Sequence, residues 1–204
     1  MVVVDSTEAN LLWQVVSVHL MALLAVCVVW GCQAPSQAEP VTPHVIVVSI
    51  DGLRADRCHF EGNPRPTTPN LDILAQNGVH LSAAFSQSNE SLLSHAALLT
   101  GRYPSEISPI DPISYRVPEQ ILTLPEALSA VGYDTAAFVA GGHVRSELGL
   151  AQGFALWEQA SEFGSFFETV PQALAWMKER TDTRPFFALV HGYDVHRPYA
   201  HEHV

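Results

Sequence analysis

The stretch His44–Gly52, with the sequence HVIVVSIDG, decides the fold of this chain. Its β-branched residues follow one another without a polar side chain until Ser49. A run that is apolar on both faces is typical of a strand inside a parallel sheet, which is covered on both sides. The run ends at Asp51, and open α/β sheets bind their ligands at the carboxyl ends of strands. Asp51 is therefore the first candidate site residue.

Further predicted strands alternate with predicted helices along the chain. The strands cover 135–139 and 186–190, with another short strand at 79–85. The helices cover 68–76, 94–99, 124–131 and 171–180. The third helix follows a capping box, Thr123-Leu124-Pro125-Glu126. This alternation predicts an α/β fold with a mostly parallel central sheet flanked by helices.

The composition describes a globular, acidic protein. Of its 204 residues, 48% are hydrophobic and 15% are charged, which suffices for one domain with a sizeable core. A formal net charge of −11 argues against a nucleic-acid partner, although a bound cation would still permit an anionic substrate. Cys58 is the only cysteine beyond the N-terminal segment, so we expect no disulfide framework.

The N-terminal segment is expected to direct export. Residues 11–31, LLWQVVSVHLMALLAVCVVWG, are almost continuously apolar and long enough to span a bilayer. Gly31-Cys32 and a polar stretch follow, which resembles a bacterial lipoprotein leader with Cys32 as the lipidated residue. Residues 1–32 would then be the leader, 33–43 a linker and 44–204 the folded domain.

Two other interpretations of this segment stay open. Asp5 and Glu8 stand where a signal peptide carries basic residues, so an uncleaved membrane anchor or an ordinary cleaved signal peptide is also compatible. Each interpretation predicts a periplasmic or cell-envelope protein, and the lipoprotein and the anchor also predict membrane association.

Several polar residues are expected to converge at one rim of the sheet. Asp51, His143 and His196 follow predicted strands, while Ser91 and His95 come from the loop and start of the second helix. A helix N-terminus favours a tetrahedral anion. A serine hydroxyl becomes a good nucleophile only with a base or a metal, and a divalent cation on Asp51 would supply this activation. Histidines can bind the anion or protonate a leaving oxygen.

Each of these residues also has a structural interpretation. Asp51 can cap a turn, Ser91 can cap a helix, and His143 follows two glycines that can simply form a turn. His191 and Asp194 are weaker candidates for the site.

Five segments, in one consistent order, resemble the sulfatase family of the alkaline-phosphatase superfamily. They are VIVVSIDGLRAD (45–56), TTPNLDILAQNGVHLSAAFSQS (67–88), SLLSHAALLTGRYPSE (91–106), AAFVAGGHVRSELGLAQGF (136–154) and ALVHGYDVHRPY (188–199). The resemblance implies an α/β sandwich. It also implies hydrolysis of sulfate or phosphate esters through a covalent intermediate with a divalent metal.

The resemblance also implies roles for individual residues. Ser91 corresponds to the nucleophile, and Asp51 corresponds to a metal ligand. His95, the second expected catalytic residue, stands where typical sulfatases have an arginine. His143 and His196 correspond to residues that bind the substrate. The implied metal is Ca²⁺ for an oxygen-ligand site, or Zn²⁺ or Mn²⁺ if the chemistry is phosphatase-like.

Three departures from the family pattern matter. The formylglycine motif, Cys/Ser-x-Pro-x-Arg, would read Ser91-Leu92-Leu93-Ser94-His95, without Pro or Arg. Gly52 stands where a second aspartate is usual. The remaining metal ligands of the family lie well beyond the His-x-Pro-Tyr segment, whereas this sequence stops five residues after Tyr199. We therefore expect a fragment with a truncated sheet and little activity of its own.

Three functions therefore compete. The first is hydrolysis of small-molecule or glycan sulfate esters, with Ser91 or formylglycine made from it. The second is a phosphoric mono- or diester hydrolase, or a phosphoglycerol-type transferase, that uses unmodified Ser91. The third is a catalytically inactive binding protein of the envelope. The oligomeric state is not predicted.

Overall fold

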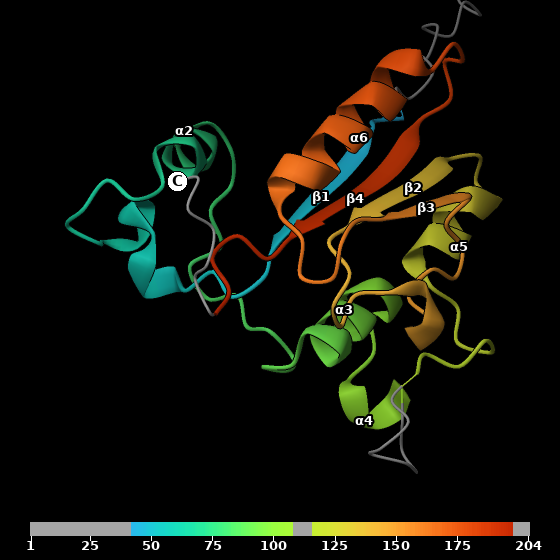
Figure 1. Ribbon diagram of the computed structural model, residues 1–204, viewed down its shortest axis with the longest axis horizontal. Coiled ribbons are helices and arrows are strands. Elements are labelled where there is room, and N and C mark those ends of the chain that lie inside the picture. Colours follow the sequence, from blue (N-terminus) through green and yellow to red (C-terminus); the bar gives the residue numbers. More distant parts are fainter. Residues whose placement is uncertain (1–41, 108–115, 198–204) are drawn as a thin grey trace, which may run out of the picture. The chain divides into compact units, whose positions relative to one another are not determined.

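The computed structural model describes residues 42–107 and 116–197 (Figure 1). The predicted leader 1–32 with Cys32, and residues 33–41 of the predicted linker, lie outside the described residues. In the part of the chain that is described, no helix combines the length and apolar character needed to cross a membrane. Cys58 is a buried free thiol.

A four-stranded parallel sheet forms the centre of the described residues. The strands are β1 (Val45–Ile50), β2 (Asp134–Val139), β3 (Leu156–Gln159) and β4 (Phe186–Gly192), in the order β1-β4-β2-β3. All three neighbouring pairs are parallel, which confirms the predicted fold class. Ser49 on β1 is in register with His191 on β4, so strand pairing brings two polar residues from distant parts of the sequence together.

The helices connect these parallel strands. They are α2 (Pro69–Asn77), α3 (Ser91–Thr100), α4 (Pro104–Ile107), α5 (Leu124–Ala130) and α6 (Phe166–Glu179). Short 3-10 turns lie at Ala55–Arg57, His59–Glu61 and Ser146–Leu148. In Figure 1, α6 runs along the sheet beside β1 and β4, whereas α3 lies near one end of the sheet.

Two apolar clusters pack on opposite faces of the sheet because alternate strand residues point to opposite sides. On one face, Ala137, Val139 and Leu189 pack with side chains of α3, together with Leu128 of α5. On the other face, Ala136, Phe138 and Val190 pack with side chains of α6 that include Ala173 and Trp176. Residues of β2 contribute to both clusters, which explains why the strand is almost entirely buried.

Three sequence predictions need correction. Residues 79–85 form no strand, and Phe85 in this segment is 82% exposed. An apolar segment that has no neighbouring strand to pair with cannot form the hydrogen bonds of a sheet. The last helix begins at Phe166 rather than Pro171, because a second capping box between Ser165 and Glu168 starts it earlier. The strand β3 was not predicted.

The capping box predicted at Thr123 is present. The Thr123 side chain accepts a hydrogen bond from the Glu126 N–H at 3.4 Å, and the Thr123 N–H donates to Glu126 Oε2 at 2.8 Å. The Thr123 hydroxyl also donates to the Gln152 carbonyl at 3.0 Å, so the cap fastens α5 to the segment before β3. Hydrogen bonds from Thr123 and Gln152 lower the pKa of Glu126, so the Glu126 carboxylate is ionised at neutral pH.

We expect Thr123→Ala to lower the free energy of unfolding by about 1 kcal/mol, because it removes the cap acceptor. Urea denaturation followed by tryptophan fluorescence measures this change. Ser129→Ala, on an exposed position of the same helix, is the matched control and should change stability by less than about 0.5 kcal/mol. Equal effects of the two substitutions would show that the box does not stabilise the fold.

Candidate active site

A cavity of about 410 Å³ lies where β1 and the loop after β4 meet the start of α3. Asp51, Ser91, His95 and His196 all line it. The fold thus brings together four of the five residues predicted to act in catalysis, substrate binding or metal binding. As many as 145 positions of sequence separate them. His143, the fifth, is not among the lining residues.

Asp51 directly continues β1, and its N–H donates to the Gly192 carbonyl at 3.0 Å, which fixes it beside the end of β4. Its side chain is only 11% exposed. Burial by itself would raise the pKa of Asp51, but the facing His191 Nε2 and the nearby Ser91 hydroxyl favour the charged carboxylate, so the pKa lies below its ordinary value. The carboxylate is therefore ionised at neutral pH.

Ser91 is the first residue of α3, not a residue ahead of it as the predicted helix at 94–99 implied. The first turn of a helix has N–H groups that lack partners within the helix, and these attract anions. The Ser91 side chain lies close enough to the Asp51 carboxylate to help lower the pKa of Asp51. The hydroxyl thus sits between a carboxylate and a helix N-terminus, as a nucleophile for an anionic ester requires.

His95 is 5% exposed and joins α3 to β1. Its Nδ1 donates to the Ser91 carbonyl at 2.7 Å, and its Nε2 accepts from the Ser49 hydroxyl at 2.9 Å, since a carbonyl can only accept. Burial lowers the pKa of His95, so the ring is neutral at pH 7. Both ring nitrogens are occupied by these contacts, which hold Ser91 in place.

His196 lies on the loop after β4, and two contacts fix that loop. The Phe166 N–H at the start of α6 donates to Asp194 Oδ2 at 2.9 Å. The His196 N–H donates to the Tyr193 carbonyl at 2.9 Å. His196 Nδ1 lies 2.6 Å from the Arg197 carbonyl and must donate to it, which leaves Nε2 with a lone pair in the neutral ring. Asp194 therefore anchors the loop.

His143 reaches this region through its backbone. Its N–H donates to the Tyr193 hydroxyl at 3.1 Å, and its exposed ring lies edge-on to Phe163 with 6.0 Å between centroids. Tyr193 in turn contacts the His196 ring, with 5.4 Å between centroids. The predicted substrate-binding role of His143 stays a prediction.

Gly52 explains the missing second aspartate. Its φ is +77°, a conformation that side chains rarely adopt, and a Cβ at this position would lie 3.1 Å from His196 Cα. The backbone of His196 therefore occupies the space into which a side chain at position 52 would project. One fewer carboxylate stands beside Asp51 as a result.

The site supplies part of a metal-binding set. Asp51 Oδ2 is buried and has no hydrogen-bond partner, which fits an oxygen that faces a hard cation. The Ser91 hydroxyl is a second oxygen of the same cavity. Across the described residues, however, no group of three His, Cys, Asp or Glu side chains is arranged to hold a metal. The described residues thus fit a cation through Asp51 but do not complete its coordination.

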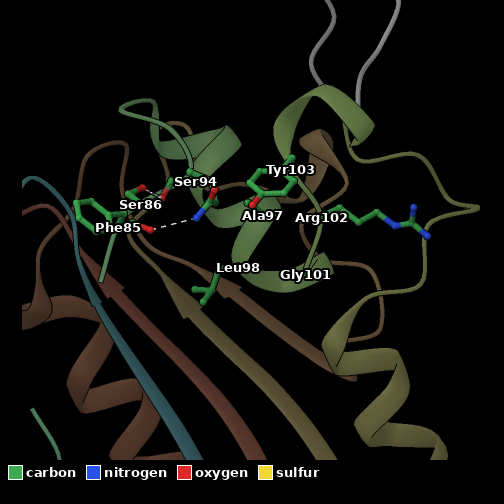
Figure 2. Close-up of a pocket in the computed structure, with 9 residues that line it drawn as sticks. Phe85, Ser86, Ser94, Ala97, Leu98, Gly101, Arg102 and Tyr103 are labelled. Carbon is green, nitrogen blue, oxygen red and sulfur yellow. Dashed lines mark hydrogen bonds between the residues drawn. The ribbon is translucent and has the colours of Figure 1, made fainter. Parts of the chain in front are cut away.

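A second cavity of about 550 Å³ lies along α3 (Figure 2). Ser86 and Ser94 line both cavities, and their hydroxyls are 2.7 Å apart. Figure 2 shows Phe85 beside this serine pair, whereas the Arg102 side chain points away from it. The end of the second cavity that adjoins Ser91 is therefore lined by hydroxyls and an aromatic ring, which suits a neutral, hydroxyl-bearing group.

The sequence model of the family described as Sulfatase matches residues 43–203, which is most of the chain. The chain belongs to the sulfatase family. It is similar to the ulvan-active sulfatase of Formosa agariphila, with 28% identity over 191 residues that cover 80% of this chain and 37% of the relative. It is also similar to the N-acetylglucosamine-6-O-sulfatase of Bacteroides thetaiotaomicron, with 25% identity over 200 residues that cover 87% of this chain and 35% of the relative.

Solved structures support the alkaline-phosphatase-like fold. The crystal structure of Ps i-CgsB in complex with k-i-k-neocarrahexaose matches with a TM-score of 0.64 and 22% identity, covering 76% of this chain and 46% of that one. The chain spans about a third of the length of the two curated sulfatases. The family is thus established, and the activity of the whole protein is treated below as a proposal.

The structure adds three residues that sequence reasoning missed or ranked low. Ser49 and Tyr193 contact predicted site residues, and His191 lies 3.6 Å from the Asp51 carboxylate. Extending the predicted strand 186–190 by two residues would have placed His191 next to the strand end, but its register with Ser49 requires the sheet order.

We expect Gly52→Ala to destabilise the fold more than Gly101→Ala and to displace His196. Both glycines have positive φ, +77° and +66°, so both substitutions carry the cost of a left-handed alanine, about 1–2 kcal/mol. Of these two glycines, only Gly52 has a neighbour within 4 Å of the added Cβ. The additional decrease in the free energy of unfolding of Gly52→Ala, relative to Gly101→Ala, therefore measures the contact with His196. Urea denaturation and the shift of the His196 backbone amide resonance measure both effects. A smaller loss for Gly52→Ala would contradict the packing described above.

Proposed function

We propose that this chain carries the nucleophile of a sulfate-ester hydrolase, and that Ser91 is this nucleophile. The observation that supports the proposal most directly is the placement of Ser91 beside the ionised Asp51 carboxylate at the first turn of α3. Membership of the sulfatase family supports the choice of ester.

In the proposed reaction, the Ser91 oxygen forms a bond to sulfur while the bond between sulfur and the leaving oxygen breaks. The neutral His196 lines the cavity and donates from Nδ1 to the Arg197 carbonyl, so its Nε2 accepts the Ser91 proton and then passes it to the leaving oxygen. Water then attacks the sulfur of the covalent intermediate, which releases sulfate and restores the serine. The N–H groups at the start of α3 stabilise the charge on the sulfate oxygens.

A divalent cation held by Asp51, with Ca²⁺ as the first choice, would lower the pKa of the Ser91 hydroxyl and polarise the ester oxygens. His95 holds the backbone of Ser91 through the bond to its carbonyl, so that the hydroxyl keeps one orientation. The remaining ligands of the cation are not supplied by the described residues.

We propose a sulfated carbohydrate as the substrate. The two curated relatives are named for ulvan and for N-acetylglucosamine-6-O-sulfate chemistry. The hydroxyl and aromatic lining between Ser86, Ser94 and Phe85 provides a surface on which a sugar ring can stack and form hydrogen bonds. Export and membrane association through residues 1–32 and Cys32 stay proposals that rest on the sequence.

A phosphoric-ester hydrolase is the second candidate, and one observation favours it. Leu93 and His95 replace the Pro and Arg of the formylglycine motif, and His95 is engaged with Ser49 and Ser91. An unmodified serine would then be the nucleophile. Mass spectrometry of the peptide that contains Ser91 separates the two: an aldehyde favours sulfate chemistry, and an intact hydroxymethyl group favours the phosphate ester.

We expect Ser91→Ala to lower turnover of aryl sulfate or phosphate esters by at least about 10³-fold, because the nucleophile is lost. Steady-state kinetics on a panel of both esters measures this effect. Thr100→Val removes a hydroxyl at the other end of the same helix and is the control that should leave turnover unchanged. Full activity of Ser91→Ala would refute the assignment of the nucleophile, and cleavage of neither ester by the full-length wild-type protein would favour an inactive binding protein.

We expect Asp51→Asn to weaken Ca²⁺ binding by at least about 10-fold, because a neutral amide replaces the charged ligand oxygen. Isothermal titration of the metal-free protein with Ca²⁺, and separately with Zn²⁺, gives the dissociation constants. Asp56→Asn alters an exposed carboxylate that forms an ion pair with Arg54 and does not line the cavity, so it should leave both constants unchanged. Identical constants for both variants would remove Asp51 from the metal site.

A further inference from the structure

His191 is a fully buried histidine whose ring orientation is determined by the backbone of a neighbouring strand. It lies on β4 with 0% of its surface exposed. The Ala140 N–H, just after β2, points at His191 Nδ1 with 3.3 Å between the nitrogens. Because a backbone N–H can only donate, Nδ1 must accept. The neutral ring therefore carries its proton on Nε2.

The protonated nitrogen faces the carboxylate of Asp51. His191 Nε2 and Asp51 Oδ2 are 3.6 Å apart, and both are buried polar atoms without a hydrogen-bond partner. An unpaired buried donor or acceptor costs about 1–3 kcal/mol, so two that face each other favour a shorter contact. Closing the gap from 3.6 Å to a hydrogen-bond distance of about 3.2 Å needs a shift of only about 0.4 Å.

The ring of His191 has little freedom to turn elsewhere. The rings of His95 and Tyr193 contact it edge-on, with centroids 5.0 and 4.7 Å away. The buried Thr169 hydroxyl donates to the His191 carbonyl at 3.1 Å, which ties this point of β4 to α6. The carboxylate of Asp51 is therefore the group that must move, and the imidazole is the fixed partner.

We propose that His191 is a positioning residue: its Nε2–H holds one oxygen of Asp51 and turns the other toward the bound cation. The inference rests on the proposed function, because it assigns His191 a task in the same metal site. His191 does not itself ligate the metal in this arrangement, since a ligating nitrogen needs the lone pair that the Nε2 proton occupies. Carboxylate ligands generally need such hydrogen-bond partners to keep their orientation.

Two substitutions separate this role from packing. His191→Gln places an amide N–H near the position of Nε2 and so keeps the donor toward Asp51. His191→Asn places its amide oxygen near the position of Nδ1, which preserves the acceptor for the Ala140 N–H but does not reach Asp51. Both variants lose the aromatic contacts, so packing alone predicts equal effects.

Calorimetric titration of the full chain with Ca²⁺ should show that His191→Asn binds the ion 10- to 100-fold more weakly than the wild type. Losses of this size are typical when a residue that hydrogen-bonds a metal ligand is removed. His191→Gln should stay within about threefold of the wild type. Equal constants for the two variants, or a weaker constant for His191→Gln, would overturn the inference.

Nitrogen NMR of the metal-free wild type gives an answer even if a variant fails to fold. We expect the His191 ring to be protonated at Nε2, and the Nε2 resonance to move in Asp51→Asn. A ring protonated at Nδ1, or a resonance that Asp51→Asn leaves unmoved, would overturn the inference whether or not the protein binds a cation. If the resonances behave as expected but the wild type binds neither Ca²⁺ nor Zn²⁺, the contact stands and the proposed function fails.

Discussion

The His95 ring joins the strand that leads to Asp51 with the helix that begins at Ser91. One of its nitrogens holds the Ser91 carbonyl and the other accepts from Ser49 of β1. Because the His95 ring is buried, breaking either contact would leave one of its nitrogens unpaired in the interior. The distance between carboxylate and hydroxyl is therefore set by a hydrogen-bonded side chain and not only by apolar packing. Every role proposed for the cavity assumes this connection.

Sheet order explains why residues so far apart in sequence meet. Placing β4 between β1 and β2 sets His191 against Ser49 on one side and near Ala140 on the other. The loop after β4 then delivers His196 to the cavity, and Asp194 fastens that loop to the N-terminus of α6. The resulting site is assembled on rigid elements, which suits chemistry that depends on fixed polar groups.

Much of this architecture could be predicted from local patterns. The continuous apolar run before Asp51 predicted β1, and the Thr123–Glu126 spacing predicted the start of α5, because each signal lies within a few residues. The predicted strand at 79–85 was wrong, since its apolar residues have no neighbouring strand. The four-residue β3 has too short a pattern to recognise, and the contact of His191 with Asp51 depends on strand order, which one sequence does not reveal.

The backbone of His196 fills the space beside Gly52, and this constrains how the protein can diverge. A mutation that introduced an acidic side chain at position 52 would meet a loop already in its way. The order of substitutions therefore matters: the segment between β4 and His196 must relax before a neighbouring carboxylate becomes acceptable.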